Sequence, residues 1–211
     1  MLISHKHKFI FAHVWKTGGN SVRIALKPFS EELYPKKKSS VLNFNSLFRK
    51  EDCEPIKIDQ HITLNEIQAI LEPNKFSQYF KFAFVRNPLD LMVSYYHFIT
   101  QKANNHPQKE FIQSLKGFED YVKWSEENEM IRLSQHKFIL DDQGKMLADY
   151  VGRYEHFQES FDEILKRLKI ENIEIKKVNT SSHNHYLKYY NSTTEEIVRS
   201  VLSEDFRILK Y

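Results

Sequence analysis

The sequence has little of several features that would place it in a specialised class. Cys53 is the only cysteine among the 211 residues, so no intrachain disulfide can form and we expect a reducing compartment. No run approaches the ~18–20 consecutive apolar residues that a membrane-spanning helix needs. The first residues also lack the basic and then apolar order of a signal peptide. We therefore expect a cytoplasmic protein without a membrane span.

An excess of charge of one sign is also missing. Lys and Arg outnumber Asp and Glu by 31 − 28 = 3, whereas nucleic-acid-binding domains concentrate basic residues on one face. We predict no nucleic-acid partner. The one compact basic run, Pro35 to Ser40, is either a solvated loop or a contact for an acidic substrate. The length and the 41% of apolar residues predict a single globular domain over residues 1–211.

The first half of the chain alternates strand patterns with helix patterns. Phe9–His13 reads as a strand, and a helix with regularly spaced apolar residues follows from about Asn20. Phe80–Val85 is almost continuously apolar, as a strand buried on both faces is. Asn87 then suits a helix N-cap, and Pro88 suits the first helical position. Such units predict an α/β domain with a central parallel sheet flanked by helices.

The remaining elements follow from capping, periodicity and turn signals. A capping box at Thr63 and Glu66 starts a helix that Pro73 closes. A cap at Thr193 or Thr194 starts the closing helical segment. We further predict a strand at Ile56–Ile58, helices over residues 118–128 and 157–170, and a hairpin over residues 137–154 with its turn at Asp141–Lys145.

Three strand-to-helix turns carry polar residues suited to bind an anion. Ligands of open parallel sheets bind beyond the carboxyl ends of the strands, where these turns are expected to lie. The first turn offers helix N–H groups beside two glycines, which allow close approach of a phosphate. Side-chain donors add to these N–H groups. The turns are Gln60–Ile62, Arg86–Pro88 and Lys16–Ser21, the last comprising Lys16, Thr17, Gly18, Gly19, Asn20 and Ser21.

The turn at Arg86 offers a second anion site. The planar guanidinium suits bidentate binding of phosphate. Ser94 lies seven residues after the N-cap Asn87, so helical geometry returns it nearly to the same face. Two anion sites on one sheet edge suggest a ligand with phosphate groups at both ends.

The stretches "FAHVWKTGGNSV" and "FKFAFVRNPLDLMVSYYHF" resemble the two cofactor signatures of sulfotransferases that use 3′-phosphoadenosine 5′-phosphosulfate (PAPS). The similarity is to the carbohydrate-type branch, which includes heparan 2-O-sulfotransferases and bacterial relatives. It covers residues 9–30 and 61–98 well and implies a P-loop-NTPase-like fold. Residues 31–60 and 101–146 match nothing in that family, and we interpret them as acceptor-side insertions.

The resemblance implies a role for each residue of the two signatures. The residues from Lys16 to Ser21 would bind the 5′-phosphosulfate, and Arg86 with Ser94 would bind the 3′-phosphate. Asn20 departs from the family, which more often has threonine there, although an amide can also donate to a phosphate oxygen. His61 matches the position of the catalytic histidine.

The order of the first signature differs from that of NTPases, in which lysine follows the glycines and a Ser or Thr holds magnesium. A sulfuryl group has fewer ionisable oxygens than a phosphoryl group, so we expect no metal. Lys16, ahead of the glycines, can reach the oxygen that bridges phosphorus and sulfur and stabilise charge on the leaving 5′-phosphate. His61, in a turn on the ligand edge, suits the base, unless it only packs against or caps the following helix.

We therefore predict an enzyme that moves the sulfuryl group of PAPS to a hydroxyl acceptor, a carbohydrate or glycan precursor. One alternative is a nucleotide-dependent kinase of similar architecture. The missing G-K-[ST] order and the lack of an evident magnesium carboxylate disfavour it. The other alternative is a non-catalytic binder, which Lys16 and His61 disfavour. We expect His13 to support the first turn, and Arg153 and Glu155 to form a structural pair. The acceptor and the oligomeric state stay open.

Overall fold

The chain folds around a four-stranded sheet. The computed structural model describes residues 1–31, 59–175 and 184–211. The strands are β1 (Leu2–Ser4), β2 (Phe9–Ala12), β3 (Phe80–Val85) and β4 (Tyr150–Arg153), in the spatial order β1-β2-β3-β4. β2, β3 and β4 run parallel, and β1 adds an antiparallel edge that the sequence did not predict. The predicted α/β fold with a central, mostly parallel sheet is confirmed.

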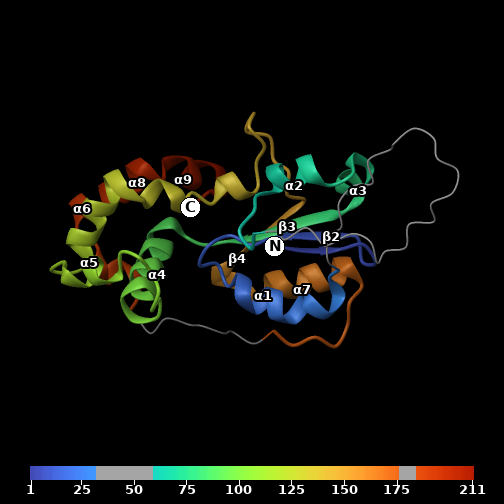
Figure 1. The fold of residues 1–211 in the computed structure, drawn as a ribbon, viewed down its shortest axis with the longest axis horizontal. Coiled ribbons are helices and arrows are strands. Elements are labelled where there is room, and N and C mark those ends of the chain that lie inside the picture. Colours follow the sequence, from blue (N-terminus) through green and yellow to red (C-terminus); the bar gives the residue numbers. More distant parts are fainter. Residues whose placement is uncertain (32–58, 176–183) are drawn as a thin grey trace, which may run out of the picture.

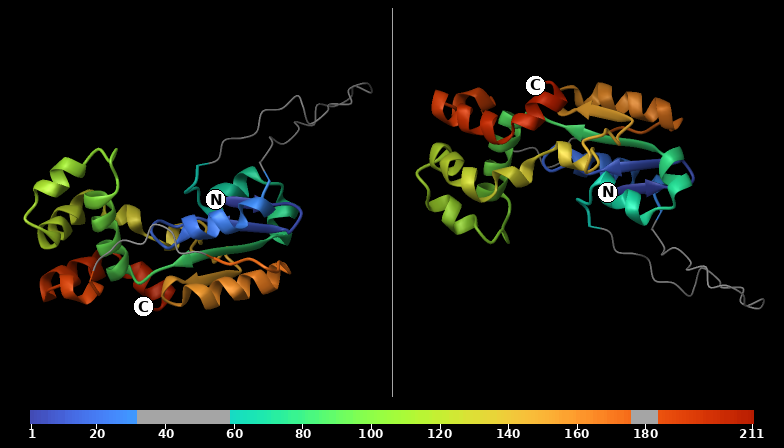
Figure 2. Two further views of the ribbon diagram at one scale, coloured as in Figure 1. Left: turned by 90° about the horizontal axis from the view of Figure 1, so that it is seen from below. Right: turned by 90° about the horizontal axis from the view of Figure 1, so that it is seen from above.

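Helices cover both faces of this sheet (Figures 1 and 2). One face packs against α1 (Gly19–Leu26) and α7 (Phe157–Leu168), which enclose the phenylalanines of β2 and β3. The opposite face packs against α2 (Leu64–Ile70), α3 (Pro73–Gln78) and α9 (Ser203–Leu209). β3 is buried on both sides, which explains why its sequence is continuously apolar.

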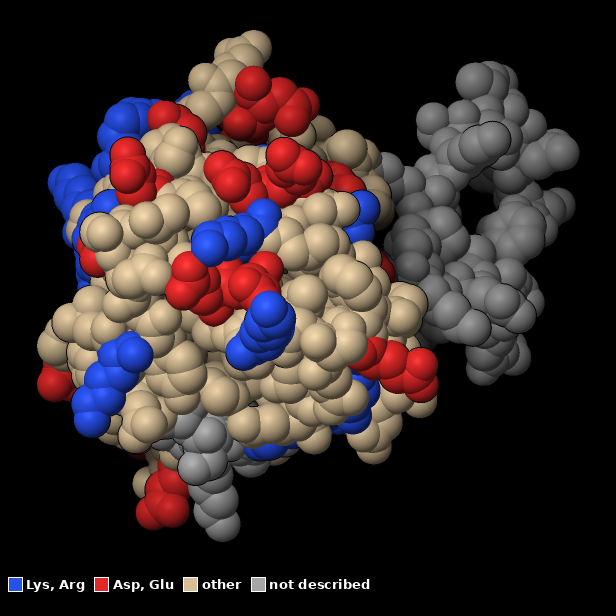
Figure 3. Space-filling view, turned by 90° about the vertical axis from the view of Figure 1, so that its left-hand side faces the viewer, with Lys and Arg blue, Asp and Glu red and all other residues tan. Residues whose placement is uncertain are grey.

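A second group of helices lies beyond the carboxyl end of β3 and shares its own apolar cluster (Figure 2). It comprises α4 (Pro88–Gln101), α5 (Lys109–Ser114), α6 (Phe118–Asn128) and α8 (Ser192–Val201). Acidic and basic side chains are interspersed on this end of the molecule (Figure 3), and ion pairs join Lys123 to Glu119 and Arg199 to Glu195. Within the described ranges, no helix is both long and apolar enough to cross a membrane.

Short 3₁₀ helices connect these elements. They are η1 (Lys27–Phe29), η3 (Met130–Leu133), η4 (His136–Phe138), η5 (Tyr154–His156) and η6 (Tyr186–Tyr189). The basic run Pro35–Ser40 and the strand predicted at Ile56–Ile58 lie outside the described residues.

The hairpin predicted over residues 137–154 is only partly present. Its turn forms, because Gly144 N–H donates to the Asp141 carbonyl over 3.0 Å and Leu140 bridges to Met146. The expected first arm begins as η4, and the second arm continues into β4, which pairs with β3 instead. Turn chemistry specified the turn, but a strand that joins the sheet beside β3 and packs against α7 is more stable than a two-stranded hairpin. Gly152 permits this packing, since a Cβ there would lie 3.0 Å from both Phe84 and Ser160.

Of the three N-caps predicted from the sequence, the structure confirms two. Thr63 and Glu66 form the reciprocal capping box, and Asn87 Oδ1 accepts from Leu89 N–H over 2.9 Å. Pro73 lies two residues after Leu71, the C-cap of α2, as predicted for a proline that closes a helix, and it is also the first residue of α3. The predicted cap of α8 was wrong. Asn191 is the N-cap, because it precedes Thr194 by the three residues that a capping box requires.

This corrected cap gives a test of the fold. Asn191→Ala removes the oxygen that accepts from Thr194 N–H over 2.9 Å. We expect the free energy of unfolding, measured by urea denaturation, to fall by about 1 kcal/mol. Thr193 is exposed and lies two residues after Asn191, so Thr193→Ala is the matched control. It should change the free energy of unfolding by less than about 0.5 kcal/mol. Equal losses in the two variants would contradict the assignment of the cap.

Candidate active site

The glycine turn after β2 has the geometry of an anion site. Gly18, the N-cap of α1, has φ 81°, a left-handed conformation that favours glycine. A Cβ on Gly18 would lie 2.7 Å from Phe157 Cε2, and one on Gly19 would lie 1.9 Å from His13 Cδ2. Both positions therefore require glycine. At the start of α1, Ser21 N–H donates to the Gly18 carbonyl over 2.9 Å, so the N–H groups of Gly19 and Asn20 are those suited to an anion.

Lys16 is held in an unusual conformation beside this turn. Its φ of 58° is left-handed, which is uncommon outside glycine and often marks a functional constraint. Its Nζ lies over the Phe98 ring, 4.2 Å from the centroid. Burial, together with the charges of Arg86 and Lys102, lowers the pKa of Lys16 to about 8. Among the described residues no carboxylate forms an ion pair with Lys16, so an anionic ligand would supply the missing charge.

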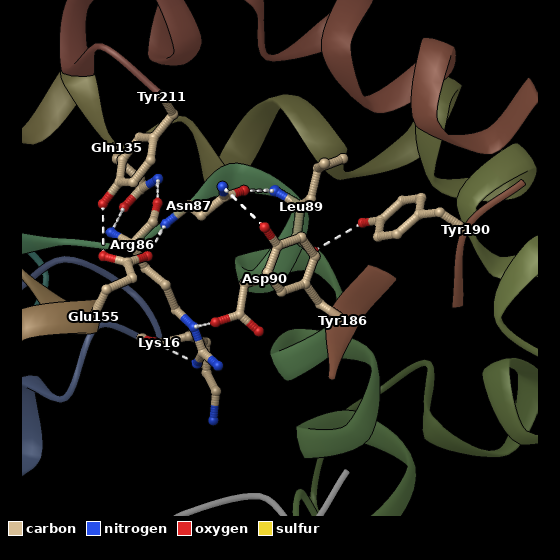
Figure 4. Close-up of polar contacts among 10 residues, drawn as sticks. All are labelled: Lys16, Arg86, Asn87, Leu89, Asp90, Gln135, Glu155, Tyr186, Tyr190 and Tyr211. Carbon is tan, nitrogen blue, oxygen red and sulfur yellow. Dashed lines mark hydrogen bonds and ion pairs between the residues drawn. The ribbon is translucent and has the colours of Figure 1, made fainter. Parts of the chain in front are cut away.

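Arg86 lies against the same turn (Figure 4). Its Nη1 donates to the Lys16 carbonyl over 3.3 Å, and its Nε donates to Asp90 Oδ2 over 2.7 Å. The guanidinium also lies 4.3 Å above the centre of the Tyr154 ring and is only 5% exposed. The Nε edge is thus occupied by Asp90. The N–H groups left for a phosphate are on the two terminal nitrogens.

Helix α4 brings Ser94 between these two cations. Asp90, Ser94 and Phe98 recur every four residues and so share one face of the helix. Asp90 at one end of this face contacts Arg86, and Phe98 at the other end contacts Lys16. Ser94 is buried, with 2% exposure. Ser94, predicted from helical spacing, therefore lies on the helix face that contacts both cations.

His61 is oriented by contacts on several sides. Its Nδ1 lies 2.8 Å from the His13 carbonyl, and Trp15 stacks on the ring with centroids 3.5 Å apart. A carbonyl only accepts, so Nδ1 carries the proton and Nε2 is the basic atom. Burial is the main cause that lowers the pKa of His61, which keeps the ring neutral near pH 7. The geometry suits a general base.

Gln60 connects this histidine with the glycine turn. Its Nε2 lies 3.4 Å from His61 Nε2 and 3.5 Å from Asn20 Oδ1. The base atom of His61 therefore faces the first residues of α1. This contact also occupies the Asn20 oxygen, so the amide nitrogen of Asn20 is the group suited to an anion.

Thr17 and His13 support the turn from inside. The Thr17 hydroxyl, fully buried, donates to the Val14 carbonyl over 3.1 Å, so its backbone N–H is the group suited to an anion. His13 packs between Gly19 and His61, with ring centroids 4.5 Å apart for the two histidines. Burial, chiefly, lowers the pKa of His13 to about 2, and a permanently neutral ring fits a supporting role. Ser21 is buried at the start of α1.

Sequence reasoning missed several side chains of the site. Asp90 was not recognised as the partner of Arg86, although its position four residues after Arg86 is the spacing of an ion pair. Tyr154 directly follows β4. Because β4 was predicted to be an arm of a hairpin, nothing in the sequence led us to expect Tyr154 beside Arg86. Trp15 and Phe98 were not singled out, because no local pattern distinguishes a ring that covers His61 or Lys16 from one in the core.

The glycine turn gives a matched pair of variants. Gly18 and Gly144 have similar left-handed φ values of 81° and 78°, but only Gly18 has neighbours within 4 Å of an added Cβ. Alanine at either position should cost about 1–2 kcal/mol for the conformation. Gly18→Ala should lose about 1–3 kcal/mol more of the free energy of unfolding through the contact with Phe157. Equal losses in urea denaturation would show that Phe157 moves away freely.

Comparison with known proteins agrees with this geometry. No curated protein and no solved structure matches the chain. A family model, described as the sulfotransferase family, matches residues 1–211, which is the whole sequence given. The chain thus belongs to the sulfotransferase family.

Proposed function

We propose that this protein transfers the sulfuryl group of PAPS to a hydroxyl of a carbohydrate or glycan precursor, as the resemblance to the carbohydrate-type branch suggests. The observation that carries the proposal is the 3.3 Å contact between Arg86 Nη1 and the Lys16 carbonyl. It joins the two turns that bear the signature residues. A ligand with anionic groups at both ends would meet a cation at each of them.

The site suits PAPS because it holds positive charge that the carboxylates of the described residues neutralise only in part. Lys16 and the first-turn N–H groups of α1 suit the 5′-phosphosulfate. The terminal nitrogens of Arg86, together with Ser94, suit the 3′-phosphate. Asp90 neutralises part of the Arg86 charge, whereas Lys16 has no described acidic partner. The bound nucleotide would thus compensate a buried cation.

The residues support an in-line transfer in which His61 is the base. His61 Nε2 takes the proton of the acceptor hydroxyl as its oxygen forms a bond to sulfur. The bond between sulfur and the bridging oxygen breaks, and its electron pair stays on the 5′-phosphate of 3′-phosphoadenosine 5′-phosphate (PAP). Lys16 stabilises that charge. The imidazolium formed on His61 lies on the face of Trp15, which favours a cation.

A groove of about 670 Å³ beside the His61 turn supports a place for the acceptor. Thr63, two residues after His61, lines it, whereas His61 itself does not; one further wall comes from residues 136–144 and another from α9. The first of these walls belongs to the segment 101–146, which we assign to the acceptor side. Its lining includes Asn65, Lys137 and Asp142, polar groups suited to hydrogen bonds with sugar hydroxyls.

A kinase of similar architecture is the second candidate, and one contact disfavours it. In NTPases the Ser or Thr after the lysine holds magnesium through its hydroxyl. Here the hydroxyl of Thr17, directly after Lys16, is buried and donates within the turn.

Nucleotide binding and sulfuryl transfer test the proposal together. PAP should raise the Tm more than ATP–Mg²⁺ does, and Arg86→Ala should abolish the preference. With labelled PAPS and a library of hydroxyl acceptors, the wild type should transfer sulfate. His61→Ala should lower kcat by about 10²–10⁴ through loss of the base. Lys16→Ala should lower it by about 10²–10³ through loss of the charge at the leaving group.

Two results would contradict the proposal. A preference for ATP–Mg²⁺ over PAP would favour the kinase. Binding of PAP with equal inertness of wild type, His61→Ala and Lys16→Ala would favour a non-catalytic binder.

The pKa values of Lys16 and His61 predict a bell-shaped dependence of kcat/KM on pH. The active form needs neutral His61 and charged Lys16. Because the pKa of His61 is lowered from 6.5, activity should persist below that pH. Because the pKa of Lys16 is about 8, activity should fall as pH rises through that value. Lys16→Arg, which stays charged, should remove the falling limb, and an unchanged limb would show that another group titrates there.

A further inference from the structure

The Arg86–Asn87 turn is held by side chains from the second half of the chain. Gln135 is 0% exposed, and its amide makes two hydrogen bonds with the backbone of Arg86 (Figure 4). Its Oε1 accepts from Arg86 N–H over 2.8 Å, and its Nε2 donates to the Arg86 carbonyl over 2.7 Å. No other residue of the described chain makes hydrogen bonds of both kinds with Arg86.

These bonds replace a missing sheet partner. β3 ends at Val85, so the next residue would have unpaired backbone groups in a buried place, which is costly. A side-chain amide offers one acceptor and one donor, like a peptide group of a neighbouring strand. With both backbone groups of Arg86 paired, the peptide planes on its two sides are fixed. The direction of its Cα–Cβ bond is then set before any ligand binds, and Asp90 and Tyr154 hold the guanidinium at the other end.

Gln135 is itself held by a buried carboxylate. Asp205 of α9 is 0% exposed, and its Oδ2 accepts from Gln135 N–H over 2.8 Å. Its Oδ1 accepts from His136 N–H over 2.9 Å and lies 2.6 Å from His136 Nδ1. Asp205 therefore fixes η4, and through it the amide that contacts Arg86.

The neighbouring residue Asn87 is held in a similar way. Glu155 Oε1 accepts from Asn87 N–H over 2.6 Å, and Tyr211 O–H donates to Glu155 Oε2 over 3.0 Å. The Arg153 guanidinium lies 4.4 Å above the centre of the Tyr211 ring. The expected pair of Arg153 with Glu155 was wrong, because both residues contact Tyr211 instead. Two separate side chains, Gln135 and Glu155, thus fix successive residues of the turn.

We propose that Gln135 is a positioning residue of the nucleotide site, which fixes the backbone of Arg86 so that its guanidinium faces Lys16 and the 3′-phosphate. The inference rests on the proposed function, because it assigns Arg86 to the nucleotide. Asp205 acts one step further away, by holding Gln135. Gln135 is fully buried and both of its amide atoms bond the Arg86 backbone, so we expect its effect on binding to pass through Arg86.

A double-mutant cycle on PAP affinity tests this path. Gln135→Met keeps the approximate volume and removes both hydrogen bonds to Arg86. By isothermal titration calorimetry, we expect the Kd of PAP to rise about ten-fold in this variant. In the Arg86→Ala background the same change should raise the Kd less than about two-fold, because coupled residues are not additive.

Two further variants separate positioning from stability. Tyr121→Phe removes a buried hydrogen bond of 3.1 Å to Glu129 in the second helical group, away from Arg86. It should lower the free energy of unfolding but leave the Kd of PAP unchanged. Gln135→Glu keeps an acceptor for Arg86 N–H and loses the donor to its carbonyl. It carries the test if Gln135→Met does not fold, and its loss of affinity should also vanish in the Arg86→Ala background.

The outcomes distinguish this inference from the proposed function. Wild-type affinity for PAP in a folded Gln135→Met or Gln135→Glu protein would overturn the inference alone. An equal loss of affinity with and without Arg86 would also overturn it, since the effect would not pass through Arg86. Failure of the wild type to bind PAP would instead overturn the proposed function, and the inference with it.

Discussion

The parallel pairing of β2 with β3 is the constraint on which the rest of the site depends. Ala12 pairs with Ala83, so the two strands end at nearly the same level of the sheet. The turns that follow them are then neighbours, although 70 residues separate Lys16 from Arg86. One hydrogen bond, from Arg86 Nη1 to the Lys16 carbonyl, joins these turns. Any shift of register between the strands would separate the two cations and remove the site.

Bringing two cations together in a partly buried place has an electrostatic cost. Among the described residues, a carboxylate offsets this cost for one cation but not for the other. Asp90 pairs with Arg86, whereas Lys16 rests on the Phe98 ring and its pKa is lowered. A cation without a carboxylate is less stable in such a place but better able to stabilise an incoming negative charge. An anion beside Lys16 would offset this cost, which fits the nucleotide site that we propose.

The groups to which we assign chemical roles and the groups that hold them come from different parts of the chain. Lys16, His61 and Arg86 all lie in turns that follow directly on short local patterns. Their supports are mostly distant in sequence: Trp15 and the His13 carbonyl hold His61, and Gln135 holds Arg86. A turn beyond the end of a strand has no ladder partner. Gln135, just before η4, and Glu155 of η5 supply the missing hydrogen bonds, and Asp205 of α9 holds Gln135. The second half of the chain thereby contributes to the site.

The sequence by itself determined the elements whose signals are local. The continuous apolar run of β3, the cap at Asn87 and the capping box at Thr63 depend on residues a few positions apart, so their patterns predicted them correctly. Only the tertiary structure decided that residues 150–153 pair with β3, that Trp15 covers His61 and that Gln135 contacts Arg86. Those contacts join residues tens of positions apart. Their stability comes from burial and from pairing of polar groups that become neighbours only when the sheet has formed.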